Sequence, residues 1–122
     1  MNLSKLQEGK RGEELAVTFL KTLGYLILDR NFRLRNGEID IVCLDKERRT
    51  LVFVEVKTRS SDEFGSPLEA ITWWKLKALT RAAQFYKISH RGLPDQMRID
   101  AVLVQLSGTS DPTIEHVKNI SG

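Results

Sequence analysis

The sequence has few of the features that secreted and membrane-spanning proteins depend on. Its 122 residues include one cysteine, so no disulfide can form within the chain. No apolar run is long enough to cross a bilayer, and the first residues, MNLSKLQEGKRGEE, lack the apolar segment of a secretory signal. Cys43 lies in an apolar run, where a lone thiol is usually a small buried hydrophobic residue. These absences predict a cytoplasmic protein with no membrane partner.

The chain also lacks internal repeats, low-complexity tracts and linker-like segments. Its length suits a single domain with one core over residues 1–122. The formal net charge of +3 permits a nucleic-acid partner without requiring one. Between Ala70 and Pro94 there are five basic residues and no acid, namely Lys75, Lys77, Arg81, Lys87 and Arg91. Such a group is either a solvated surface or a contact for an acidic partner.

Two segments have the apolar spacing of amphipathic helices. The first covers residues 8–24, with Gly24 as its stop, and its stripe consists of Ala16, Phe19, Leu20 and Leu23. The second covers residues 68–89 after a loop at Phe64–Pro67, and its inward stripe is expected to consist of Trp73, Leu76, Leu79, Ala83 and Tyr86.

Strands are predicted where β-branched and alternating apolar residues gather, over residues 25–34, 38–45, 51–58 and 99–106, with a weaker strand at 113–117. Asn36-Gly37 between the first two is the strongest short hairpin signal. A helix between the third and fourth strands favours a parallel crossover. The predicted fold is therefore α/β, with a mixed central sheet flanked by helices.

Charged side chains converge at one end of the predicted meander. Glu55 and Lys57 share one face of a strand, about 7 Å apart, because alternate residues point the same way. Asp40 begins the neighbouring strand. Carboxylates bind Mg²⁺ or Mn²⁺, which lowers the pKa of bound water, and a lysine can orient or deprotonate a nucleophile that attacks a phosphodiester. From spacing alone, a cross-strand ion pair on a solvated face fits equally well.

The stretch NGEIDIVCLDKERRTLVFVEVKTRS resembles the motif block of the bacterial YraN family. The blocks GKRGEELA, FGSPLEAIT and RIDAVLV extend the resemblance from Gly9 to about Val104. That family resembles the restriction-endonuclease-like, or PD-(D/E)xK, superfamily of nucleases. The resemblance implies an αβββαβ core, Asp40 and Glu55 as metal ligands, and Lys57 as the catalytic lysine. Ile39 stands where many superfamily members have proline.

Holliday-junction-resolvase-like relatives imply a further acidic ligand from the first helix. Glu13 lies on the inward stripe and is favoured over Glu14, which lies toward its edge. The alternative is that Glu13 is an ordinary first-turn acid favoured by the helix dipole. Glu38 is either an additional metal ligand or simply a residue of the hairpin. Asp100 is expected to be a buried structural partner of Arg98 or Lys75, because a buried carboxylate needs one.

Phosphate contacts are expected from basic and hydroxyl side chains near this site, namely Thr58, Arg59, Lys75, Lys77 and Arg81. Trp73 and Trp74 are adjacent, so they cannot both face the core. An exposed indole would stack on a base or pack against a partner chain, although most such residues only pack. His90 and His116 have no metal-ligand spacing and are assigned no role.

The function predicted from these features is a divalent-metal-dependent endonuclease acting on DNA, with branched or single-stranded DNA suggested by analogy alone. The main alternative is a non-catalytic nucleic-acid-binding module that keeps the fold. A scaffold protein that binds a partner through Trp73 or Trp74 is a third reading. A homodimer would supply two sites, although the sequence identifies no interface.

Overall fold

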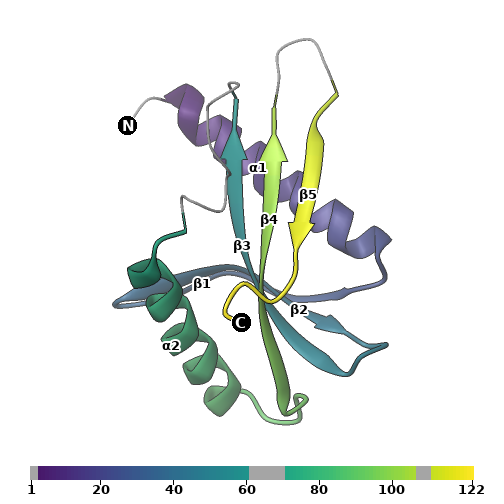
Figure 1. The fold of residues 1–122 in the computed structure, drawn as a ribbon, viewed down its shortest axis with the longest axis vertical. Helices are drawn as coiled ribbons and strands as arrows, with labels where there is room; N and C mark the ends of the chain where they lie inside the picture. Colours follow the sequence, from purple (N-terminus) through teal and green to yellow (C-terminus); the bar gives the residue numbers. More distant parts are fainter. Residues whose placement is uncertain (1–2, 61–70, 107–110) are drawn as a thin grey trace.

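The computed structural model describes residues 3–60, 71–106 and 111–122, in which two helices flank one five-stranded sheet (Figure 1). The elements follow in the order α1 (Leu3–Thr22), β1 (Leu26–Leu34), β2 (Gly37–Asp45), β3 (Thr50–Arg59), α2 (Trp73–Ser89), β4 (Gln96–Gln105) and β5 (Thr113–Val117). The strands lie side by side in chain order. β3 pairs parallel to β4, and the other neighbours pair antiparallel. The predicted αβββαβ order, the parallel crossover and the weaker last strand are confirmed.

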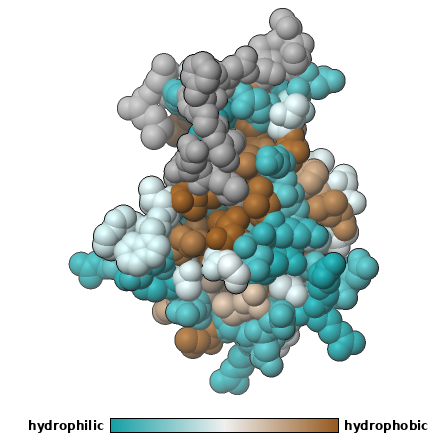
Figure 2. All heavy atoms as spheres, viewed as in Figure 1, coloured by the Kyte–Doolittle hydropathy of each residue, from teal (hydrophilic) through white to brown (hydrophobic). Residues whose placement is uncertain are grey.

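The sheet is buried on both faces, because one helix covers each of them. Val52 and Val54 of β3 pack in the cluster that includes Leu20 of α1. Phe53, between them in sequence, packs in the cluster that includes Leu79 and Tyr86 of α2. Figure 1 shows α1 behind β3, β4 and β5, and α2 beside the β1–β2 hairpin. In the same view, hydrophobic surface gathers in the middle of the face and hydrophilic surface borders it (Figure 2).

Both helices have capped ends. At the end of α1 the N–H of Gly24 donates to the carbonyl of Lys21, and the N–H of Tyr25 donates to that of Leu20. Gly24 has φ of 89°, which completes a Schellman motif. α2 begins one residue after Thr72, whose hydroxyl accepts the N–H of Lys75 at 3.1 Å. Residues 68–70 of the predicted helix and the loop expected at 64–67 lie outside the described residues.

The first hairpin forms, with its turn one residue earlier than the Asn-Gly signal indicated. Leu34 pairs with Gly37, so Arg35 and Asn36 form the loop. The φ of Gly37 is not positive. Instead, a Cβ at Gly37 would lie 3.2 Å from the carbonyl oxygen of Ala78 in α2. Glycine therefore lets the turn approach the helix closely, rather than supplying a left-handed conformation.

Two apolar residues expected to face inward are exposed. Trp73 is 60% exposed, because it opens α2 before the helix reaches the sheet, and the first buried residue of α2 is Leu79. Leu23 is exposed because it lies beyond the last helical residue of α1. Cys43 is fully buried as predicted, and burial raises the pKa of its thiol to about 12. Neither helix among the described residues is long and apolar enough to cross a membrane.

Asp100 of β4 is the fully buried centre of a polar network. Its carboxylate accepts hydrogen bonds from Arg98 at 2.8 and 3.0 Å and from the backbone N–H of Asn119 at 2.9 Å. His116 Nε2 lies 2.8 Å from the same carboxylate. Burial alone would raise the pKa of Asp100, but the hydrogen bonds from His116, Arg98 and Asn119 lower it. The structural role predicted for Asp100 is confirmed with Arg98 and not with Lys75, and His116 is a partner that the sequence did not indicate.

We expect Asp100→Ala to lower the free energy of unfolding by about 3–5 kcal/mol, because buried Arg98 would lose its two short contacts with this carboxylate and keep the longer one, of 3.6 Å, to Asp45. Denaturant titration at neutral pH measures this change. Asp111 is an exposed acid, and Asp111→Ala should change stability by less than about 0.5 kcal/mol. Equal stabilities for the two variants would contradict the assignment of Asp100 as a network centre.

Candidate active site

A cleft of about 160 Å³ opens between α2 and the adjacent strands β2 and β3. Its lining combines acidic, basic and small residues, namely Gly37, Glu38, Asp40, Glu55, Lys75, Ala78 and Leu79. The structure thus brings the predicted acids Asp40 and Glu55 together in one concave place, with Lys75 from the first turn of α2 beside them.

Asp40 is held where β2 and β3 diverge. Their pairing ends at Ile41 and Val54. One residue further along β2, Asp40 Oδ2 accepts the backbone N–H of Val56 at 2.8 Å. The carboxylate therefore satisfies a strand donor that would otherwise lack a partner. This hydrogen bond fixes the Asp40 side chain against β3, close to Glu55.

Glu55 is a buried carboxylate with two lysine neighbours. Its side chain is 4% exposed. Lys75 Nζ lies 2.8 Å and Lys57 Nζ 3.8 Å from Glu55 Oε1, so Glu55 and Lys57 project toward the same face of β3, as the alternation predicted. Lys75 was expected to contact phosphate or to pair with Asp100, and not to meet Glu55. Its place at Glu55 follows from the parallel crossover, which brings the start of α2 near the carboxyl end of β3.

The site's electrostatics are dominated by the two acids. Burial raises the pKa of Asp40 to about 7, and the nearby charges of Glu55, Glu13 and Glu38 raise it as well, against the hydrogen bond from Val56. Burial and the neighbouring amino group of Lys75 lower the pKa of Lys57. Burial lowers the pKa of Lys75, but its hydrogen bonds to Glu55 and Lys57 and the charges of Glu55 and Asp40 together raise it by more. Lys57 is therefore the lysine that more readily becomes neutral.

Glu13 lies on α1 near this site but is engaged with β1. Its Oε1 accepts from Asn31 Nδ2 at 2.9 Å and lies 3.4 Å from Arg30 Nη2. Glu14 pairs with the same guanidinium at 2.7 Å. Since α1 begins at Leu3, Glu13 is in mid-helix, and its reading as a first-turn acid is wrong. Its role as a metal ligand stays a prediction.

Glu38 lines the cleft from the start of β2. Its carboxylate lies 3.4 Å from Arg33 Nε across the hairpin, where both side chains are exposed. The ion pair and the place in the cleft leave both predicted roles of Glu38 open, as a further metal ligand or as a hairpin residue.

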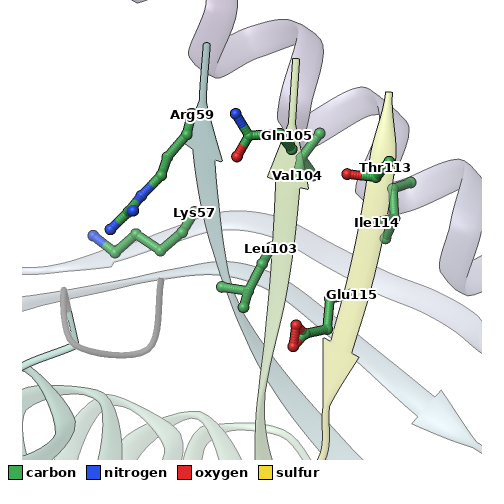
Figure 3. A pocket seen from close by; sticks show the side chains of 8 residues that line it. All are labelled: Lys57, Arg59, Leu103, Val104, Gln105, Thr113, Ile114 and Glu115. Atoms are coloured by element: carbon green, nitrogen blue, oxygen red, sulfur yellow. The ribbon is translucent and has the colours of Figure 1, made fainter. Parts of the chain in front are cut away.

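Lys57 borders another hollow, of about 240 Å³, which lies along β3, β4 and β5. Figure 3 shows Lys57 and Arg59 extending to the same side of β3, with Leu103 and Glu115 on the neighbouring strands. Thr58 belongs to the opposite face, because a Cβ at Gly12 of α1 would overlap its Oγ1. Of these two predicted phosphate contacts, Arg59 lies beside Lys57, and Thr58 lies under α1.

The other predicted phosphate contacts lie on the outer side of α2. Lys77 Nζ lies 4.3 Å from the centroid of the Trp73 ring, a cation–π distance. Arg81 borders a hollow beside the β1–β2 turn. Trp73 and Trp74 are both exposed, at 60% and 73%, and their rings meet edge to face. The expectation that the two indoles do not both face the core is confirmed, and Trp73, which was expected to face inward, is exposed as well.

The donors available for a metal are few. The described residues contain no group of three or more His, Cys, Asp and Glu side chains arranged to hold an ion. Asp40 and Glu55 are the two carboxylates that the cleft offers as ligands. Burial and the charge of Glu55 raise the pKa of Asp40, so the ionised form of Asp40 has too little positive charge nearby to stabilise it. Mg²⁺ is commonly bound through one or two carboxylates, with water and phosphate oxygens completing its shell. The pair fits a cation completed by substrate and water, and not a cage made of protein alone.

Comparison with known proteins returns one family. A family model described as "Uncharacterised protein family UPF0102" matches residues 12–104. A UPF0102 protein of Geobacter metallireducens is 44% identical over 98% of this chain and 95% of its own. A UPF0102 protein of Caldicellulosiruptor saccharolyticus is 47% identical over 86% and 87%, and one of Alkaliphilus oremlandii is 49% identical over 80% and 84%. The matched region includes Asp40, Glu55, Lys57 and Lys75.

The raised pKa of Asp40 predicts that the metal-free protein loses stability as pH increases. Asp40 ionises near its usual value of 3.8 in the unfolded chain and near 7 in the folded one. Between these values the folded state holds the extra proton, so the free energy of unfolding falls as pH rises. Asp40→Asn removes this dependence, and its stability relative to wild type should increase from about pH 4 to pH 7 and then level off.

Denaturant titrations in EDTA at several pH values test this, with Asp111→Asn as an exposed-carboxylate control. A difference between Asp40→Asn and wild type that stays constant over this pH range would show that Asp40 ionises normally.

Proposed function

The chain belongs to the Uncharacterised protein family UPF0102, the YraN family, and we propose that it hydrolyses DNA phosphodiester bonds with the help of a divalent metal ion. The single observation that carries this proposal is the meeting of Asp40, Glu55 and Lys75 in one cleft, with Lys57 Nζ 3.8 Å from the Glu55 carboxylate. A carboxylate whose pKa is raised by burial and by a neighbouring acid, beside a lysine whose pKa is lowered, is typical of reactive sites.

Lys57 is the group proposed to act on the nucleophile. Water attacks phosphorus, the bond from phosphorus to one ester oxygen breaks, and the proton of the attacking water passes to the neutral amine of Lys57. Lys75 keeps its charge, which assists Lys57 in staying neutral and offsets the charge of Glu55. Asp40 and Glu55 would hold the ion. Mg²⁺ or Mn²⁺, when bound, neutralises phosphate charge and lowers the pKa of water.

A non-catalytic nucleic-acid-binding module is the second candidate. Two observations favour it: the lysines already neutralise Glu55, and no three-residue ligand cluster exists among the described residues. In that case the cleft would hold a phosphate against Lys57 and Lys75 without turnover. The two functions differ in whether a divalent ion changes the protein and in whether DNA is cut.

We expect wild-type protein to cut labelled DNA with Mn²⁺ or Mg²⁺ and not with EDTA. Lys57→Ala should reduce the rate by about 100- to 10,000-fold, the range of a lost general base. The assay uses single-stranded, linear duplex and four-way branched DNA in parallel. Lys46→Ala, in the exposed turn between β2 and β3, is the matched control and should cut at the wild-type rate. Binding of DNA at low salt with no cutting of any substrate would favour the second candidate.

Metal binding is expected to raise the melting temperature of wild type and not that of Asp40→Asn. An ion at about 100 times its dissociation constant adds roughly 2.7 kcal/mol to the stability of the folded state. The rise should be larger above about pH 7 than below it, because Asp40 must be ionised to bind the ion. Asp111→Asn should respond as wild type does. An equal rise in the Asp40→Asn variant would exclude this cleft as the metal site.

A further inference from the structure

A third hollow, of about 340 Å³, lies between α2 and the β1–β2 turn, next to the cleft. Gly37 and Ala78 line both places, so the hollow and the cleft are neighbours on either side of the close approach of Gly37 to Ala78. The hollow's walls are apolar, from Leu34, Ala78, Ala82 and Phe85, and two arginines stand with them, Arg35 and Arg81. We refer to this hollow as the Phe85 pocket.

The Phe85 pocket offers free groups of two kinds. Phe85 lines the pocket and is 52% exposed, so about half of its surface is open to a ligand. Neither Arg35 nor Arg81 forms an ion pair with another described residue. A guanidinium without a carboxylate partner is available to bind a phosphate through two parallel hydrogen bonds. An aromatic ring beside such cations suits a ligand with a flat base and an anionic phosphate.

The outer surface of α2 connects this pocket with the start of the helix. Trp74, Ala78, Arg81 and Phe85 follow one another at spacings of four, three and four residues, so they form one stripe. Trp74 lies at the cleft end of the stripe, next to Lys75, and is 73% exposed. From Ala70 to Pro94 the sequence contains no acid. A negatively charged strand can therefore follow the stripe from the cleft to the pocket without meeting a like charge on α2.

We propose that the Phe85 pocket binds an unpaired nucleotide of the strand whose scissile phosphate lies in the cleft. The inference rests on the proposed nuclease function and adds its substrate class. A base paired and stacked within a duplex cannot enter a pocket of this kind, whereas a base of a single strand can stack on Phe85. The phosphate of the same nucleotide pairs with Arg81 or Arg35. Substrates with unpaired nucleotides next to the cleavage point are thereby selected over fully paired DNA.

The test measures binding without cleavage, in EDTA and at one fixed salt concentration. A short labelled oligothymidylate is compared by fluorescence anisotropy with an abasic oligomer of the same length and charge and with a blunt duplex of the same length. We expect the oligothymidylate to bind more tightly than either competitor. Both tryptophans of the chain lie in the first turn of α2, so a change in intrinsic tryptophan emission also reports that the strand follows the stripe.

Phe85→Ala should weaken oligothymidylate binding by about 5- to 100-fold, the range for one stacked base, and should leave the abasic oligomer unaffected. Arg81→Ala should weaken both ligands. The matched controls are Leu23→Ala, which removes a similarly exposed apolar side chain at the end of α1, and Lys46→Ala, a remote charge. Both controls should bind as wild type does. Melting curves of all variants verify that the exposed substitutions leave the fold intact.

Three outcomes would overturn the inference: equal affinity for thymidylate and abasic oligomers, duplex preferred over single strand, or a dimer that Phe85→Ala disrupts. The last result would show that the pocket receives a second copy of the chain. The proposed hydrolysis can fail separately, because base-dependent binding in EDTA with no metal-dependent cleavage would retain the pocket and reject the nuclease.

Discussion

Two carboxylates held close together at a buried end of the sheet are the constraint around which this molecule is organised. Burial raises the pKa of Asp40, and the neighbouring charge of Glu55 raises it further. Compensation comes from separate elements: the backbone N–H of Val56 in β3 for Asp40, and Lys75 of α2 for Glu55. The divergence of β2 from β3 and the docking of α2 are both required for the pair to exist in the folded state.

The second helix serves three purposes at once. Its inner face packs Leu79 and Tyr86 against the sheet, its first turn supplies Lys75 to the cleft, and its outer face exposes Trp74 and Phe85. Exposed aromatic side chains contribute nothing to a monomer's core. Their position on one stripe with Arg81, beside a pocket that neighbours the cleft, is consistent with a surface used for binding.

The groups around Asp100, in the middle of β4, affect its pKa in the opposite direction. Asp100 is as deeply buried as any residue, yet its pKa is lowered, because Arg98, His116 and the N–H of Asn119 surround it with donors. Asp40 has a single backbone donor and acidic neighbours, and its pKa is raised. The pKa of an aspartate is therefore lowered in one place and raised in the other, according to what faces the carboxylate.

The sequence by itself determined the order of helices and strands, the parallel crossover, and the placing of Glu55 and Lys57 on one face of β3, because these follow from local periodicity and connection rules. Burial of Cys43 and the pairing of Asp100 with Arg98 were also predictable from neighbouring residues. Only the tertiary structure decided that Lys75 meets Glu55, that His116 meets Asp100, that Gly37 allows a close approach to α2, and that Trp73 is exposed. Each of these depends on how a helix or strand docks against elements distant in sequence, and local periodicity does not specify docking.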